Sequence, residues 1–333
     1  MSGKTYYGGQ AVMEGVMMRG RSTMAVAVRA PSGEIAVYHE TLSGSGVVQR
    51  VRPWPLIRGV FMLWDTMVLG MRALVFSANV SLTEETDERA DEPPETLSGV
   101  ALWATVAVSI LFSIGLFFVL PLVAIHFLDQ YISSSIVSNV VEGLIRLGLL
   151  VGYMLILRSV KDVRRVFQFH GAEHKTINAY EAGDPLDVEH VRAHSLQHTR
   201  CGTGFLLVVV LISIVIFALL GRPDFVWRVT SRIVLVPVIA AIAYEFIKWS
   251  AGHDQNRFVR ILIAPSMALQ RLTTSEPDAS MLEVAIVSLK RVLVAEEALP
   301  RVEVERDGII SVDESGRILP VADGLAEPSV VGD

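Results

Sequence analysis

Residues 97–125 read LSGVALWATVAVSILFSIGLFFVLPLVAI and contain no charged side chain. A helix of this length exceeds the roughly 30 Å thickness of the hydrocarbon core of a bilayer. Further apolar runs cover residues 140–157, 204–220 and 233–249. Glu142 and Arg146 lie four residues apart near the start of the second run, so they can pair on one helical face. We therefore predict a mainly α-helical protein with four transmembrane spans, at about 97–125, 140–157, 204–220 and 233–249.

The composition supports a membrane protein and excludes other classes. Of 333 residues, 51% are hydrophobic and only 19% are charged, which is unusual for a soluble domain. A net charge of -6 argues against a nucleic-acid partner, because phosphate binding needs a basic surface. The single cysteine cannot form an intramolecular disulfide. Glu14 and Arg19 interrupt the first twenty residues, so no cleavable signal peptide is expected.

Basic residues predict the orientation. The loop at 158–203, between the second and third spans, contains seven lysines and arginines before residue 201, whereas the loop around Asp129 contains none. The positive-inside rule places the first loop in the cytoplasm, together with both termini. Arg222, Arg228 and Arg232 fit this orientation less well, because they would lie outside.

Amphipathic character precedes the first span. Apolar residues recur at helical spacing between Ile57 and Val75, with Arg58, Asp65 and Arg72 seven residues apart on the other side. We favour an interfacial or partner-covered helix over a fifth span, and expect both arginines to contact lipid headgroups.

The remaining chain divides by composition. Residues 24–29 and 34–40 flank Ala30-Pro31-Ser32-Gly33, which predicts a β-hairpin. The predicted segments are a β-rich glycine-motif region at 1–52, the amphipathic helix at 53–81, an acidic linker at 82–96, the transmembrane domain at 97–250, a C-terminal helical region at 251–297 and a weakly ordered acidic tail at 298–333.

The residues most suggestive of chemistry are His170-Gly171-Ala172-Glu173-His174. Two histidines four residues apart on a helix can bind one metal ion. The order His-x-x-Glu-His is the inverted zincin pattern, in which the glutamate is the general base. The alternative is a solvated polar surface on a helix that leaves the membrane.

A third ligand must come from elsewhere in the chain. His198 and Cys201 precede the third span, and Glu245 lies near the cytoplasmic end of the fourth, so all three can converge on the histidine pair. For Glu245, a salt bridge is as well supported as metal binding. For Cys201, a role as a small buried side chain is as well supported as metal binding. Glu181 is too far along a straight helix and fits a supporting role better. His190 and His194 fit a solvated stripe.

The chain also resembles a known family. Tyr7 to Gly20, Phe169 to Glu181, Cys201-Gly202-Thr203, Tyr244-Glu245, Leu272-Thr273-Thr274 and Glu276-Pro277 resemble the YqhQ-like bacterial membrane proteins over roughly residues 5–295. The resemblance implies a metal-dependent enzyme and matches at His170, Glu173, His174, His198, Cys201 and Glu245. It does not extend to His190 and His194. The glycines at 8, 9, 15 and 20 serve either a compact β fold or a lip over the metal face.

These observations predict a multi-pass protein of the bacterial inner membrane. A divalent metal, most simply zinc, would be bound by His170 and His174 with Glu245, His198 or Cys201, and Glu173 would act as the base in hydrolysis. The substrate would be a membrane-proximal peptide or a lipid-derived group. The alternative is a non-enzymatic scaffold or assembly factor with a protein partner, and the chain's oligomeric state stays open. A transporter is disfavoured, because the first and third runs lack charges.

Overall fold

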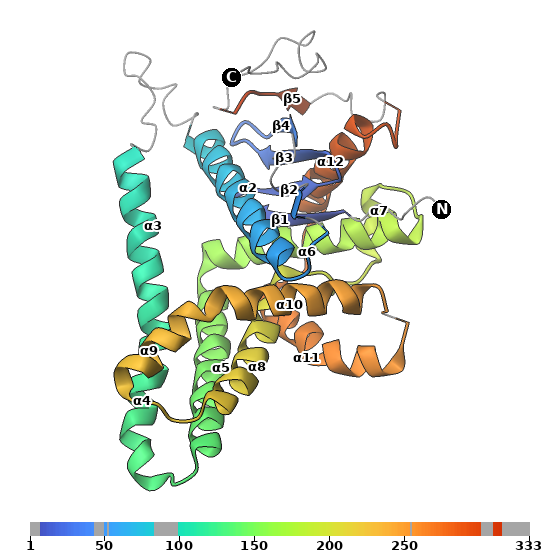
Figure 1. The fold of residues 1–333 in the computed structure, drawn as a ribbon. Coiled ribbons are helices and arrows are strands. Elements are labelled where there is room, and N and C mark those ends of the chain that lie inside the picture. The colour runs from blue at the N-terminus through green and yellow to red at the C-terminus, as the bar shows by residue number, and fades with distance from the viewer. Residues whose placement is uncertain are drawn as a thin grey trace.

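The fold is described from a computed structural model, which covers residues 7–42, 50–51, 53–82, 99–253, 255–300 and 309–314. It is mainly helical, with a small sheet at one end and long apolar helices at the other (Figure 1). In chain order the elements are β1 Gly8–Val12, β2 Gly15–Arg19, β3 Thr23–Arg29, β4 Ile35–Thr41, α2 Ile57–Leu82, α3 Gly99–Ile114, the π-helical segment η2 Gly115–Val119, α4 Leu120–Leu128, the 3-10 turn η3 Asp129–Tyr131, α5 Ser135–Ser159, α6 Lys161–Ala182, α7 Val188–Arg192, α8 Gly202–Leu220, α9 Phe225–Val234, α10 Val236–Ala251, α11 Arg257–Thr273, α12 Ala279–Ala295 and β5 Ile309–Ser311.

The sheet has the order β1-β2-β3-β4-β5, with the first four strands antiparallel and β5 parallel to β4. The predicted hairpin is β3–β4, and its turn is closed by a 2.9 Å bond from Gly33 N–H to Ala30 O. Gly33 has a φ of 92°, which a residue without Cβ adopts at little cost. The glycine-motif region supplies β1 and β2. The tail expected to be weakly ordered contributes the short strand β5. The acidic linker lies outside the described residues, apart from Leu82 at the end of α2.

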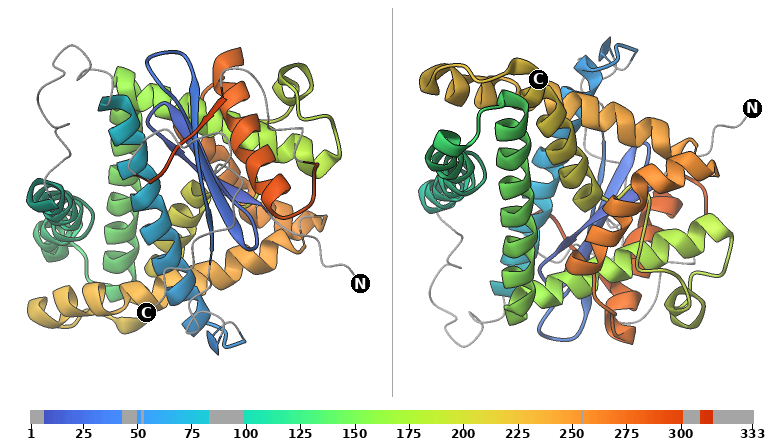
Figure 2. Two further views of the ribbon diagram at one scale, coloured as in Figure 1. Left: turned by 90° about the horizontal axis from the view of Figure 1, so that it is seen from above. Right: turned by 90° about the horizontal axis from the view of Figure 1, so that it is seen from below.

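Helices cover both faces of this sheet (Figure 2). Alternate strand residues point to opposite faces, and one face, including Met18 and Ala27, packs against α12 and α6. The other face, including Met17 and Val28, packs against Ala73 and Phe76 of α2. The sheet is therefore the central layer of a packed unit at one end of the molecule.

Helix α2 turns its charged stripe toward the protein. Its predicted stripe pairs inward: Arg58 with Glu245, Asp65 with Arg19, and Arg72 with Glu40. The opposite side is apolar and exposed, and includes Trp64, Met67, Val68, Met71 and Leu74. The arginines thus bind carboxylates of the protein itself, and the expected headgroup contacts stay a prediction. An apolar outer face of this kind is suited to a bilayer.

The other end of the molecule consists of long apolar helices. In the described part of the chain, four helices are long and apolar enough to cross a membrane, namely Ile57–Ser81, Trp103–Tyr131, Ser135–Ser159 and Gly202–Leu220. Helix α5 packs closely on α8, because a Cβ on Gly143 would overlap Ile214. This set is consistent with a multi-pass membrane protein, and it includes α2, which the sequence analysis placed at the interface.

The fourth predicted span is bent. Helices α9 and α10 pass the same length and composition test only as a pair, with a 42° bend between them. Pro237 in the first turn of α10 cannot donate a backbone hydrogen bond, which explains a break there. The span expected at 233–249 thus lies mainly in α10 and begins at the bend, and counting the bent pair as one span gives up to five.

The arginines of α9 are buried against the first two predicted spans. Glu142 binds Arg146, as the four-residue spacing predicted, and also accepts hydrogen bonds from Arg228 and Arg232 at 2.9–3.2 Å. Arg228 also binds Asp129 at 2.8 Å. The basic residues that fitted the orientation poorly are thus partners of buried carboxylates.

Candidate metal centre

Helix α6 carries the His-x-x-Glu-His pentapeptide across the base of the sheet. It follows α5 after a break at Val160, whose extended backbone redirects the chain. His170 and His174 project from the same face, and their ring centroids lie 4.4 Å apart. The spacing therefore brings the two imidazoles together as the sequence predicted.

Each imidazole is held by a backbone carbonyl. His170 Nδ1 lies 2.9 Å from Thr273 O, and His174 Nδ1 lies 2.6 Å from Leu196 O. Since a carbonyl only accepts, both Nδ1 atoms must carry the proton. In the neutral rings the lone pair is then on Nε2. Metal-binding histidines are commonly anchored in this way.

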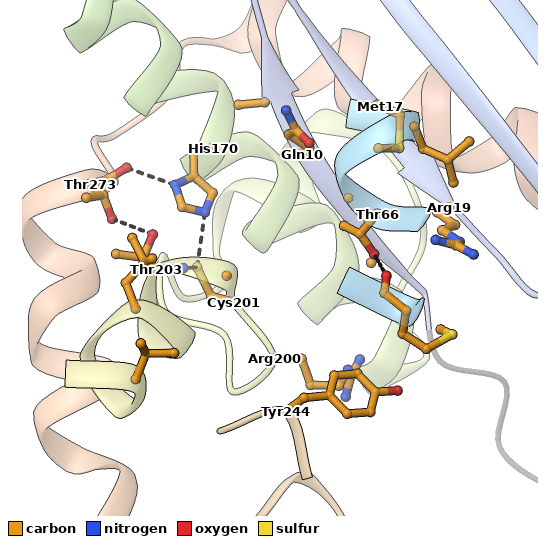
Figure 3. Close-up of a pocket in the computed structure, with 18 of the residues that line it drawn as sticks. Gln10, Met17, Arg19, Thr66, His170, Arg200, Cys201, Thr203, Tyr244 and Thr273 are labelled. Carbon is orange, nitrogen blue, oxygen red and sulfur yellow. Dashed lines mark hydrogen bonds between the residues drawn. The ribbon is translucent and has the colours of Figure 1, made fainter. Parts of the chain in front are cut away.

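Cys201 completes a group of three. Its Sγ lies 3.2 Å from His170 Nε2 (Figure 3). It caps the N-terminus of α8, where it accepts the Thr203 N–H at 3.4 Å. One ligand atom from each of His170, His174 and Cys201 lies within 4.8 Å of the others. A compact nitrogen and sulfur donor set of this kind suits zinc.

His174 supplies a further observation that bears on ligand binding. Its side chain is 1% exposed, and its Nε2 is buried with no hydrogen-bond partner. A buried polar atom without a partner is costly in a folded protein. His198 Nε2 is likewise buried without a hydrogen-bond partner, and a cation held by the group would satisfy such a nitrogen on His174.

His198 lies next to the group but outside it. Its ring centroid is 5.7 Å from that of His174, and its Nε2 is 3.6 Å from Glu181 Oε2, which is longer than a hydrogen bond. Burial lowers the pKa of His198, while Glu181 acts in the opposite direction. Gln270 holds its backbone through two 2.9 Å bonds. His198 therefore lies beside His174, outside the group of three, and its expected role as a ligand stays a prediction.

Glu181 and the two remaining histidines lie at the periphery. Glu181 binds Arg200; burial would raise its pKa, but Arg200 and His198 outweigh that effect and lower it to about 2. The supporting role expected of Glu181 at the metal stays a prediction. His190 pairs with Asp187 and His194 with Asp184, on the exposed side of the loop.

Glu245 is not among the residues brought together. Its carboxylate accepts from Arg58, with Nε to Oε1 at 2.7 Å, and from the Leu56 N–H. Helix α10 packs on α2 and α8, which directs this side chain to α2. Glu245 therefore does not complete the group. It forms a salt bridge, which was the alternative interpretation of this residue.

Glu173 lies between the histidines and the sheet. Burial raises the pKa of its carboxyl to about 7, although His170 and the Gly9 N–H act in the opposite direction. A Cβ on Gly9 would lie 3.1 Å from Glu173 Cδ. Gly9 of the glycine-motif strand therefore lies both against the neighbouring strand and at the wall of the site, whereas the space at Gly15 and Gly20 is filled by other parts of the fold.

A large cavity adjoins the group. Its volume is about 2140 Å³, and its lining includes Gly9, His170, Glu173, His198 and Cys201. Sequence reasoning missed Thr273 and Leu196 as anchors. A signal existed for Thr273, which lies in one of the stretches that carry the family resemblance.

Comparison with known proteins identifies the family. Residues 54–295 match a family described as "Protein of unknown function (DUF1385)". The chain is also 32% identical over 292 residues to "Uncharacterized protein YqhQ" of Bacillus subtilis (strain 168). This alignment covers 86% of the present chain and 92% of the relative. The chain belongs to the DUF1385, YqhQ-like family. No solved structure matches. The DUF1385 match extends from just before α2 to the end of α12, and so includes all three residues of the group.

Proposed function

We propose that this protein is a membrane-embedded, metal-dependent hydrolase whose site is formed by His170, His174 and Cys201, with Glu173 as general base. The observation that carries the proposal is the three-residue group itself, with two carbonyl-anchored imidazoles and an unpartnered, buried His174 Nε2. The site faces the cytoplasm of a bacterial cell in this proposal, following the positive-inside rule.

The residues fit a zinc ion. Two imidazole nitrogens and one thiolate leave a fourth tetrahedral position open, as in catalytic zinc sites. A bound zinc ion would supply Lewis acidity toward water and a carbonyl oxygen. His170 and His174 hold their Nε2 atoms at the site because Thr273 and Leu196 hold the opposite nitrogens.

Glu173 performs the proton transfer. In hydrolysis, the oxygen of water bonds to the carbonyl carbon, and the bond from that carbon to the leaving group breaks. Glu173 takes a proton from the water and delivers it to the leaving atom. The Gly9 N–H favours the charged form of this carboxylate.

The test measures zinc in purified protein. We expect about one zinc per chain in the native protein and a loss in the His170→Ala, His174→Ala double variant. The matched control is the His190→Ala, His194→Ala pair, which has the same spacing but exposed partners. Equal, near-zero zinc in native and double variant, or full zinc in both, contradicts the metal site.

A second variant separates catalysis from metal binding. Glu173→Gln should retain zinc and lose turnover of internally quenched peptides or fluorogenic esters by 10²-fold or more, which is the order of magnitude expected for general base catalysis. The exposed apolar face of α2 favours a second candidate function, that of a membrane scaffold. The scaffold predicts that Glu173→Gln leaves function intact while changes along α2 abolish it.

A further inference from the structure

Strand β1 is an edge of the sheet that opens onto the cavity. In the described part of the chain only β2 pairs with it. Val12 and Gly15 close a two-residue hairpin loop, so Val12, Gln10 and Gly8 exchange hydrogen bonds with β2. The backbone groups of Gly9 and Ala11 therefore point away from the sheet. Both residues line the cavity.

This free edge lies beside the candidate metal group. Gly9 of this strand lies against the predicted base, since a Cβ on Gly9 would lie 3.1 Å from Glu173 Cδ, and the Gly9 N–H acts to lower the pKa of that carboxyl. Figure 3 shows Gln10, carried by β1, together with His170 and Cys201 among the residues that line one pocket. Gly9 is exposed, and the remaining outward groups, Gly9 C=O and the N–H and C=O of Ala11, have room for an extended chain.

The cavity continues from this edge into the apolar part of the molecule. Its lining includes Leu150 and Met154 of α5 and Leu206 and Val210 of α8, and reaches Arg146. From Leu157 to Arg146 the α5 wall covers about 16 Å at 1.5 Å per residue, roughly half of the hydrocarbon thickness. One chamber thus joins a strand edge, the metal group and an apolar channel.

We propose that the outer edge of β1 binds an extended, apolar peptide segment by strand addition, and that this segment is the substrate. An unpaired strand edge is a template for pairing with another chain. Its backbone groups would be costly to leave unpaired beside an apolar channel. A peptide satisfies them, whereas a lipid offers no matching row of donors and acceptors. The apolar channel accommodates the flanking residues of a membrane-protein segment.

The assignment as substrate rests on the proposed hydrolase, but strand addition itself requires no metal. Binding is therefore measured on full-length protein in detergent after chelation, and again on the His170→Ala, His174→Ala variant. The probes are fluorescein-labelled decapeptides that alternate valine or leucine with serine or threonine. We expect peptide binding to persist without metal. Loss of the hydrolase proposal would therefore leave peptide binding intact, whereas loss of peptide binding would reject strand addition alone.

Two changes test the hydrogen-bonding mode. Ala11→Pro removes the outward N–H without removing a β1–β2 bond, and Pro is tolerated at edges. Its control, Ala11→Gly, keeps the N–H. The second change is in the probe: N-methylation at alternate residues removes the peptide's donors, whatever the variant's folding. We expect about tenfold weaker binding from Ala11→Pro and from one of the two N-methyl registers, with little change for Ala11→Gly.

Other outcomes overturn the proposal. Equal binding of the native probe and both N-methylated registers would show that pairing is absent. Displacement of the probes by vesicles of phosphatidylglycerol and phosphatidylethanolamine, with no effect of N-methylation, would assign the chamber to lipid. Failure of every decapeptide to bind folded protein would also reject strand addition.

Discussion

Removing the carboxylate of Glu142 should destabilise the helical end of the protein strongly. This side chain is 1% exposed and accepts hydrogen bonds from Arg146, Arg228 and Arg232 at 2.9–3.2 Å. Glu142→Ala leaves these three guanidinium groups close together without their shared anion. Breaking a buried pair costs about 3–5 kcal/mol, and repulsion between the arginines places the loss at or above the upper end of that range.

The assay is unfolding in mixed detergent micelles, followed by tryptophan fluorescence. Glu189→Gln is the control, because Glu189 is exposed and its replacement should change the free energy of unfolding by less than about 0.5 kcal/mol. Adding Arg232→Met to Glu142→Ala should recover at least about 1 kcal/mol relative to the sum of the single changes, because an excess cation is removed. A loss below about 1 kcal/mol for Glu142→Ala, or additive effects, would refute the network.

Three further changes test other contacts. Gly143→Ala places a Cβ against Ile214 and should cost about 1–3 kcal/mol in the same assay, with partial recovery when Ile214→Ala is added. Burial, together with Arg291, lowers the pKa of His39 to about 4. As the pH falls, the unfolded state therefore takes up the proton before the folded state does. The free energy of unfolding should be at its full value above pH 6.5 and should fall by up to about 3 kcal/mol as the pH approaches 4. Replacing His39 with Asn should flatten that pH profile, and an unchanged profile contradicts the assignment. Glu245→Gln should leave zinc content unchanged, since Arg58 binds this carboxylate; a loss of zinc would restore it as a ligand.

The sequence predicted local features of the candidate site better than long-range ones. His170 and His174 share a face because helical spacing alone determines it. The convergence of Cys201 was one of three open possibilities, and its choice over Glu245 depends on how α8 and α10 pack. That packing is not encoded in any short pattern. The carbonyl anchors were also missed: every residue has a carbonyl, so nothing marks Leu196, and the family resemblance marked the stretch around Thr273 but not its role.

The same limit explains the corrections in the fold. The seven-residue spacing of Arg58, Asp65 and Arg72 correctly indicated one charged stripe on α2. It did not indicate whether this stripe or the apolar face of α2 packs against the rest of the protein. In water that stripe would face solvent, whereas here it faces charged partners on the sheet, Arg19 and Glu40, and Glu245 on α10. The bend before α10 could have been anticipated from Pro237, and the arginines of α9 from their need for buried partners.

The π-helical segment before α4 has a mechanical consequence. Pro121 has no N–H to offer Phe117 O, the carbonyl four residues earlier, and Arg146 Nε donates to that oxygen at 2.9 Å. Two apolar helices can slide or rotate against each other at little cost in free energy, because contacts between aliphatic side chains are not directional. The hydrogen bond from Arg146 of α5 takes the place of the donor that Pro121 lacks, and hydrogen bonds are directional. It therefore fixes the axial position and the rotation of α5 relative to the helix that contains Phe117.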